Sequence, residues 1–220
     1  MALKCTTCND LASENAQLKH CSACKSTLYC STACQKEDWP IHKHVCEQFK
    51  AITTSNPRPS SAHKLTLILP ADEPKPKLVW MKFEEKTEAA EDSEDEDVIY
   101  ELPDFSYLGD GGSPQLLTIS RTMKAANQQL QRFDFEDSVV IYLREAGRID
   151  GSRTNACVGA LVKGGKRFDW KGPLIVLGQP GTALDPLVHR DISPMDIRLA
   201  VDYLRSYDGV QVHPFQAICT

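Results

Sequence analysis

The sequence lacks long hydrophobic runs, an apolar leader and a strong charge of either sign, and each absence excludes a class of protein. Apolar runs such as residues 65–69 and 174–177 are far too short to cross a bilayer. Residues 1–4 lead straight into Cys5 without the hydrophobic segment of a signal peptide, so we expect an intracellular, non-secreted protein in the nucleus or the cytoplasm. The formal net charge of −5 on 220 residues excludes a general binder of polyanions.

The N-terminal segment also lacks the basic surplus of a nucleic-acid reader. Residues 1–46 contain five lysines, no arginine and four carboxylates. What this segment has in excess is cysteine, because seven of the nine cysteines lie here. In a reducing compartment such closely spaced cysteines bind metal instead of forming disulfides. With one histidine they supply eight soft ligands, enough for two tetrahedral zinc ions: Cys5, Cys8, Cys21, Cys24, Cys30, Cys34, His42 and Cys46.

The spacing of these ligands predicts local structure. The two C-x-x-C pairs predict tight turns that aim two thiolates at one ion. A separation of four residues, as between His42 and Cys46, places both side chains on one face of a helical turn. His44 lies two residues from Cys46 and would face the other way, so His42 is the predicted ligand. The spacing alone leaves open which four ligands share an ion.

The full pattern, C-x2-C-x12-C-x2-C-x5-C-x3-C-x7-H-x3-C over residues 5–46, resembles the MYND zinc finger. The segment from Cys34 to Trp39 is part of the likeness. The resemblance implies interleaved ligands, with Cys5, Cys8, Cys30 and Cys34 on one zinc and Cys21, Cys24, His42 and Cys46 on the other. Sequential pairing is the competing arrangement. So small a finger cannot build an adequate core, and we expect it to unfold when its metal is removed.

Closed coordination shells predict structural zinc and a function on the surface of the finger. Gln35 and Trp39 lie four residues apart, so on a helix they share one face. The resemblance implies that Ser22, Gln35 and Trp39 bind an extended, proline-containing peptide, in a regulatory or transcription-related complex. The alternative for Trp39 is that its ring only covers the zinc core.

Composition divides the remaining chain. The predicted finger covers residues 1–50, a Pro- and Ser-containing linker covers 51–63, and an α+β domain covers 64–215. Residues 84–97 hold nine carboxylates and one lysine, which predicts a disordered acidic loop. Predicted strands, rich in β-branched and aliphatic residues, cover 64–69, 78–83, 116–121, 138–144 and 174–177.

Two helices are predicted in this domain, which together with its strands gives a mainly antiparallel sheet and a C-terminal helix. Asn155 would cap a short helix that runs to residue 162. Ser193 and Pro194 begin a longer helix over 194–207, with Asp196 supporting its first turn. Residues 64–208 also resemble the body of uncharacterised fungal proteins that carry the same finger, a resemblance that implies no activity.

Enzyme signatures in the sequence are incomplete. Residues 189–194 (HRDISP) look like a kinase catalytic loop, but the D-F-G and glycine-rich motifs of kinases are missing, so the segment is predicted to end a loop and cap a helix. Some MYND proteins are SET-domain methyltransferases, yet no Asn-His-Ser segment of that type occurs here. The favoured interpretation is a non-enzymatic interaction module. The alternatives are an enzyme with an unrecognised site in residues 64–215, and a finger that serves only as a structural cap on its own body.

Overall fold

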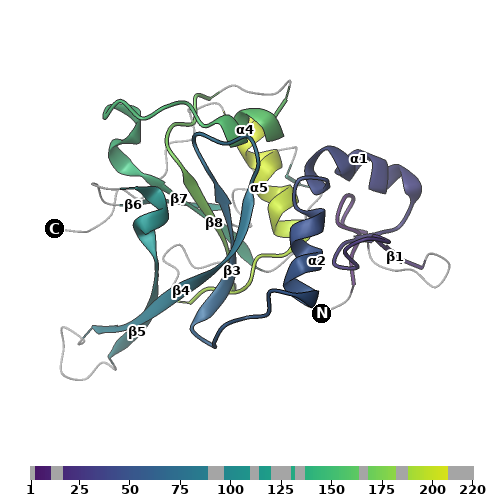
Figure 1. The fold of residues 1–220 in the computed structure, drawn as a ribbon, viewed down its shortest axis with the longest axis horizontal. Helices are drawn as coiled ribbons and strands as arrows, with labels where there is room; N and C mark the ends of the chain where they lie inside the picture. The colour runs from purple at the N-terminus through teal and green to yellow at the C-terminus, as the bar shows by residue number, and fades with distance from the viewer. Residues whose placement is uncertain are drawn as a thin grey trace.

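A six-stranded antiparallel sheet, in the order β5-β4-β3-β8-β7-β6, is the centre of the fold (Figure 1). The computed structural model describes residues 3–10, 17–88, 97–109, 114–119, 130–131, 137–163, 168–181 and 188–207. The strands are β3 (His63–Leu69), β4 (Lys77–Glu88), β5 (Val98–Pro103), β6 (Pro114–Ile119), β7 (Ser138–Arg144) and β8 (Leu174–Gln179). All five neighbouring pairs run antiparallel.

Both faces of the central strands are buried, which explains their nearly continuous apolar sequence. Along β8, Leu174 and Val176 belong to one hydrophobic cluster, whereas Ile175 and Leu177 belong to a second cluster on the opposite face. The alternation follows from the two-residue period of a strand. The short 3-10 helix η1 (Phe105–Leu108) lies on the second face, where the ring of Phe105 contacts Tyr142 at 5.1 Å between centroids.

The first face is covered by two helices, α4 (Ala156–Leu161) and α5 (Pro194–Ser206). The Asn155 side chain accepts from the Val158 N–H and donates to the carbonyls of Leu69 and Gly172, so it caps α4 and ties it to β3. Helix α5 begins with a capping box, in which the Ser193 side chain and the Asp196 side chain each accept from the other residue's backbone N–H. These two starts agree with the sequence prediction.

The cysteine-rich segment forms a small unit beside the sheet (Figure 1). It contains the hairpin β1 (Lys19–His20) and β2 (Leu28–Tyr29), followed by helices α1 (Thr32–His42) and α2 (Cys46–Thr54). Ser31 caps α1 by accepting from the Cys34 N–H. The predicted fold class, a finger followed by an antiparallel α+β domain with a C-terminal helix, is confirmed.

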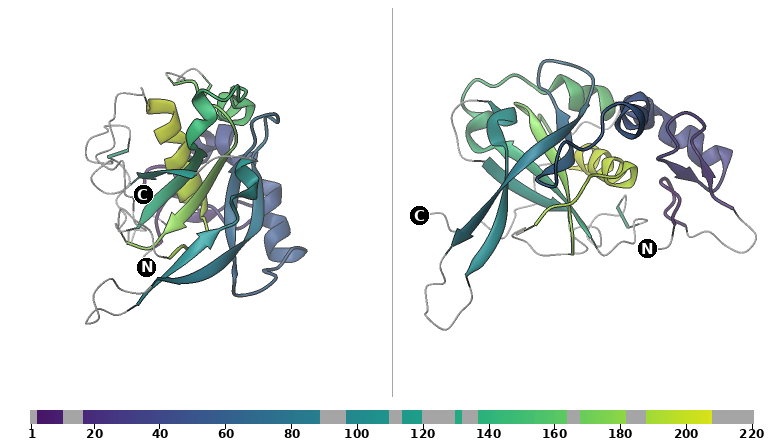
Figure 2. Two further views of the ribbon diagram at one scale, coloured as in Figure 1. Left: turned by 90° about the vertical axis from the view of Figure 1, so that its left-hand side faces the viewer. Right: turned by 60° about the horizontal axis from the view of Figure 1, so that its bottom comes forward.

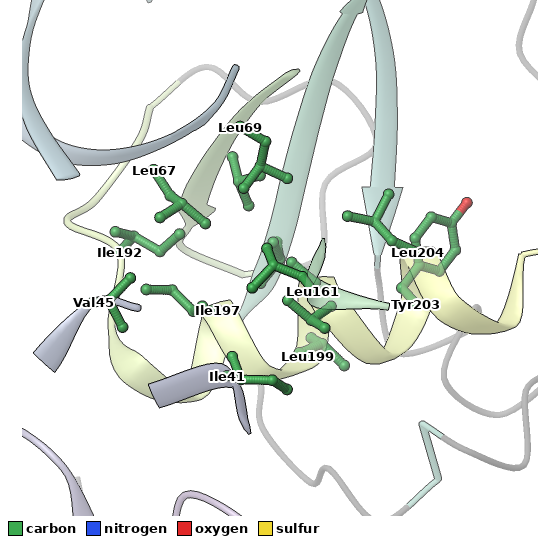
Figure 3. Packing of buried hydrophobic residues seen from close by; sticks show 14 of the residues in the cluster. Ile41, Val45, Leu67, Leu69, Leu161, Ile192, Ile197, Leu199, Tyr203 and Leu204 are labelled. Carbon is green, nitrogen blue, oxygen red and sulfur yellow. The ribbon is translucent and has the colours of Figure 1, made fainter. Parts of the chain in front are cut away.

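The finger and the body share one hydrophobic core. Ile41 of α1 and Val45 before α2 lie against Ile197 and Leu199 of α5 (Figure 3), and all four belong to the same buried cluster. Phe49 of α2 joins this cluster with 4% of its surface exposed. The Gln48 side chain adds hydrogen bonds to the backbone on both sides, donating to the carbonyls of His44 and Pro76.

Some predicted boundaries differ from the structure. Helix α2 continues to Thr54, past the start of the predicted linker, because its inner face packs on the body. Strand β4 continues to Glu88, so residues 84–88 are not part of a loop. They pair with β5, a strand that was not predicted from the sequence. The ends of β4 and β5 project as a two-stranded arm (Figure 2). Residues 89–96 of the predicted acidic loop lie outside the described residues.

Candidate zinc centres and peptide surface

The two C-x-x-C pairs form the same local turn. The Asn9 N–H donates to the Cys5 carbonyl, and the Lys25 N–H donates to the Cys21 carbonyl, at 2.9 and 3.1 Å. Asn9 and Lys25, each next to the second cysteine of its pair, are the described non-glycine residues with positive φ, at 64° and 61°. This left-handed residue lets the backbone fold back tightly, so that both thiols of a pair point to one side.

These turns bring the eight predicted ligands into two groups of four. Within each group the ligand atoms all lie within 4.8 Å of one another. The grouping is interleaved, as the family resemblance implied, and not sequential. The first group is Cys5, Cys8, Cys30 and Cys34, and the second is Cys21, Cys24, His42 and Cys46.

The spacing within each group fits a tetrahedral zinc ion. With Zn–S bonds of about 2.3 Å and Zn–N bonds of about 2.0 Å, a regular tetrahedron separates two sulfurs by about 3.8 Å, and a sulfur and a nitrogen by about 3.5 Å. The Sγ atoms of Cys21 and Cys46 lie 3.8 Å apart. His42 Nε2 lies 3.4 Å from Cys21 Sγ and 3.6 Å from Cys24 Sγ. In the first group, Cys30 Sγ lies 3.5 Å from the Sγ atoms of both Cys8 and Cys34.

A hydroxyl outside the ligand set orients His42. Thr27 is fully buried, and its Oγ1 lies 3.2 Å from His42 Nδ1. With a zinc ion on Nε2, the ring proton would sit on Nδ1 and be donated to the Thr27 hydroxyl. Such a partner fixes the ring plane and leaves the Nε2 lone pair for the metal. Thr27 carries no sequence signal of this role, since nothing in its spacing distinguishes it from other threonines.

Without a cation part of the ligand set resists ionisation. At Cys5, Cys21 and Cys24 burial is outweighed by hydrogen bonds, which lower the pKa. Burial, with the charges and hydrogen bonds of Cys21 and Cys24, raises the pKa of Cys46 to about 12. Burial also raises the pKa of Cys8. A divalent cation offsets the repulsion among close thiolates, so the residues present fit two structural zinc ions. All four positions around each ion are filled by protein ligands, which is the arrangement of structural zinc.

The sequence profile of one zinc-finger family, described as the MYND finger, matches residues 5–46. These residues are a MYND finger. The match ends at Cys46, the last ligand of the second group, and covers every residue of both groups.

Similar proteins of known name match this chain over short stretches. "SET domain-containing protein 14" of Caenorhabditis elegans is 49% identical over 49 residues, 22% of this chain and 11% of the relative. "Tudor domain-containing protein 1" of Danio rerio is 46% identical over 43 residues, 19% of this chain and 4% of the relative. Human "N-lysine methyltransferase SMYD2" is 36% identical over 89 residues, 37% of this chain and 20% of the relative. The chain thus spans a fifth or less of these relatives. No solved structure matches it.

The three residues predicted to bind peptide keep part of their surface accessible to solvent. Trp39 on α1 keeps 50% of its surface exposed, and its ring lies 6.2 Å from that of His42. Gln35, one turn earlier on α1, is half-buried, and Ser22, in the second C-x-x-C turn, is exposed. Trp39 therefore covers one edge of the second zinc group and also presents an apolar surface to solvent.

A charged network joins α1 to the body at the opposite side of this helix. Arg198 of α5 has a side chain that is 5% exposed, and it contacts Glu37 Oε1 at 2.9 Å, Asp38 Oδ1 at 3.4 Å and Asp202 Oδ2 at 3.0 Å. The Tyr29 hydroxyl donates to the other Asp38 oxygen at 2.7 Å. Burial works against the guanidinium charge, but Asp202, Asp38 and Glu37 outweigh it and raise the pKa of Arg198.

The segment that looks like a kinase loop, residues 189–194, makes contacts that tie it to the strands and to the start of α5. Arg190 binds Asp137 and, through two nitrogens, Asp196 of the α5 capping box. Its guanidinium passes so close to Gly178 that a Cβ there would lie 2.5 Å from Arg190 NH1. Asp191 accepts from the Leu65 N–H at 2.9 Å. The side chain of His189 is fully buried.

No helix among the described residues is long and apolar enough to cross a membrane.

Proposed function

We propose that the chain is a non-enzymatic, intracellular protein-interaction module whose MYND finger binds an extended, proline-containing segment of a partner. The observation that carries this proposal is the position of Trp39. A tryptophan that is half exposed on a metal-held helix, with Gln35 one turn away, offers a flat apolar surface beside a hydrogen-bonding amide.

The chemistry of the zinc groups supports the same proposal. Both shells consist of four protein ligands, so the described ligand set leaves no position for water or substrate on either metal. The matched relatives are named for SET or Tudor domains, one of them also for a MYND-type zinc finger, and the stretches that match this chain are short. A module that occurs beside different domains is typical of recognition. We further propose that the partners belong to regulatory or transcription-related complexes. We also propose that residues 64–208 form a body that fungal proteins with the same finger share.

Substitution of Trp39 tests the proposal. We expect Trp39→Ala to abolish capture of partner proteins and binding of proline-containing peptides, while two zinc ions remain bound in native mass spectrometry. Trp80→Phe is the matched control, because Trp80 lies on the body, where its Nε1 donates to the Asn56 carbonyl. A Trp39→Ala protein that binds partners as well as the wild type, or that loses zinc, contradicts the proposal.

A further inference from the structure

Four exposed lysines lie on α1 or near the turn between α1 and α2, and the proposed function does not use them. Lys36 and Lys43 lie three residues before and four residues after Trp39, so all three share one face of α1 and its C-terminal end. The Lys43 N–H donates to the Trp39 carbonyl at 3.1 Å, which keeps this helical register through the end of α1. The aromatic surface therefore has a cation one turn away on each side.

The body adds two more cations where it meets the finger. Gln48 binds both the His44 and the Pro76 carbonyls at 2.9 Å, which places Lys75, next to Pro76, beside the turn between α1 and α2. The Ala156 N–H donates to the Ala71 carbonyl, so α4 starts at this same β3–β4 loop. Lys163 follows α4, which lies next to the α1–α2 turn in Figure 1 and in the right-hand view of Figure 2.

The charges of these lysines are not neutralised by ion pairs within the described residues. Five other lysines do have a carboxylate within 4.0 Å, namely Lys50, Lys64, Lys77, Lys86 and Lys171. No described carboxylate pairs with Lys36, Lys43, Lys75 or Lys163, and all four are exposed. We call these four residues the junction patch.

From this juxtaposition we infer that the partner segment is acidic next to its proline-containing part, and that its carboxylates lie on the junction patch while its apolar part lies on Trp39. This inference rests on the proposed function and narrows the class of partner. A basic patch on a chain with a formal net charge of −5 discriminates between partners by their local charge. Nucleic acid is the less favoured occupant, because the finger has only a small excess of lysine over carboxylate.

Three synthetic peptides test the inference on the full zinc-loaded chain. Each has five prolines followed by five residues that are all Glu, all Gln or all Lys, and binding is measured by fluorescence anisotropy in 0.15 M NaCl. We expect the Glu peptide to bind about tenfold more tightly than the Gln peptide, since exposed ion pairs contribute little individually but add over four lysines. This advantage shrinks as salt increases to 0.5 M.

Two variants assign the effect to the junction patch. Replacing Lys36, Lys43, Lys75 and Lys163 together by Gln removes the preference for Glu, whereas replacing Lys19, Lys50, Lys82 and Lys171 by Gln retains it. The inference is overturned if the wild type shows no preference for Glu over Gln, including no binding of either, or if both variants behave alike. A single-stranded 20-nucleotide DNA that displaces the Glu peptide and binds more tightly than it does also overturns the inference.

The same measurements separate this inference from the proposed function. Trp39→Ala weakens binding of all three peptides by the same factor if Trp39 holds the proline part. If Trp39→Ala binds each peptide as the wild type does and the Glu preference persists, the Trp39 proposal fails and the junction patch stands.

Discussion

Arg198 is the residue whose removal tests how the finger is fixed to the body. Its guanidinium lies between Asp38 of the finger and Asp202 of α5, whose side chains are both 3% exposed. Breaking a buried ion pair from one side costs about 3–5 kcal/mol, because the opposite charge stays buried without a partner. Here Asp38 keeps the Tyr29 hydroxyl and Asp202 keeps Arg205, at 2.9 Å, so some of the loss is offset. We therefore expect Arg198→Met to lower the free energy of unfolding by about 2–4 kcal/mol.

The assay is urea unfolding of the zinc-loaded protein, followed by circular dichroism, with zinc content measured before and after. Lys50→Met is the matched control: its partner Glu47 is 3.8 Å away and both side chains are more than half exposed, so we expect a change below about 0.5 kcal/mol. The double variant Arg198→Met with Asp38→Asn should recover part of the loss, because it removes the stranded carboxylate. An Arg198→Met protein that keeps its zinc and unfolds within 1 kcal/mol of the wild type refutes this account of the network.

Two further predictions concern zinc and pH. Removing the second zinc with Cys21→Ser should destabilise the body as well as the finger, because α1 and α2 share the core of the body. Cys8→Ser, which removes a ligand of the first zinc, should destabilise the body less. Urea unfolding monitored at Trp170, which is buried in the body, distinguishes the two variants. Equal effects of the two variants on the body contradict this. Burial lowers the pKa of His189 to about 4 from 6.5. Between pH 6.5 and pH 4 the unfolded chain takes up this proton and the folded chain does not. The free energy of unfolding therefore falls as the pH is lowered from 6.5 to 4, by at most about 3 kcal/mol. His189→Phe should lose this pH dependence relative to the wild type and His63→Gln should retain it; parallel pH curves for all three proteins refute it.

Local signals explain what the sequence could predict. The Ser193-Pro194 start with Asp196 specifies its own helix, because a cap, a fixed φ and a first-turn carboxylate act within four residues. The strands β3, β7 and β8 were recognisable because central strands buried on two faces must be apolar along their length. The candidate zinc ligands were equally recognisable, since thiolate geometry constrains their spacing. Their interleaved grouping came from the family resemblance and not from the spacing.

What the sequence could not supply depends on residues far apart in the chain. Strand β5 mixes exposed and half-buried residues at the edge of the sheet, so its strand conformation follows from pairing with β4 and leaves no clear pattern. Asp38 and Arg198 are 160 residues apart, and neither one signals a partner by itself. The predicted boundary after residue 50 treated the finger as separate, whereas Ile41 and Phe49 complete the core of the body.

The helical period of α1 divides the finger into an inner and an outer side. Asp38 and Trp39 are adjacent in sequence, yet Asp38 is 2% exposed and Trp39 is 50% exposed, because successive helical residues point about 100° apart. The inner side is held by Arg198 and the shared core, so the outer side has a fixed orientation relative to Lys75 and Lys163 of the body. A finger excised at residue 50 would lose both lysines and its inner contacts. For that reason we expect binding of an acidic, proline-containing peptide to require the whole chain, and an excised finger that binds it with unchanged affinity would show that the body contributes nothing to recognition.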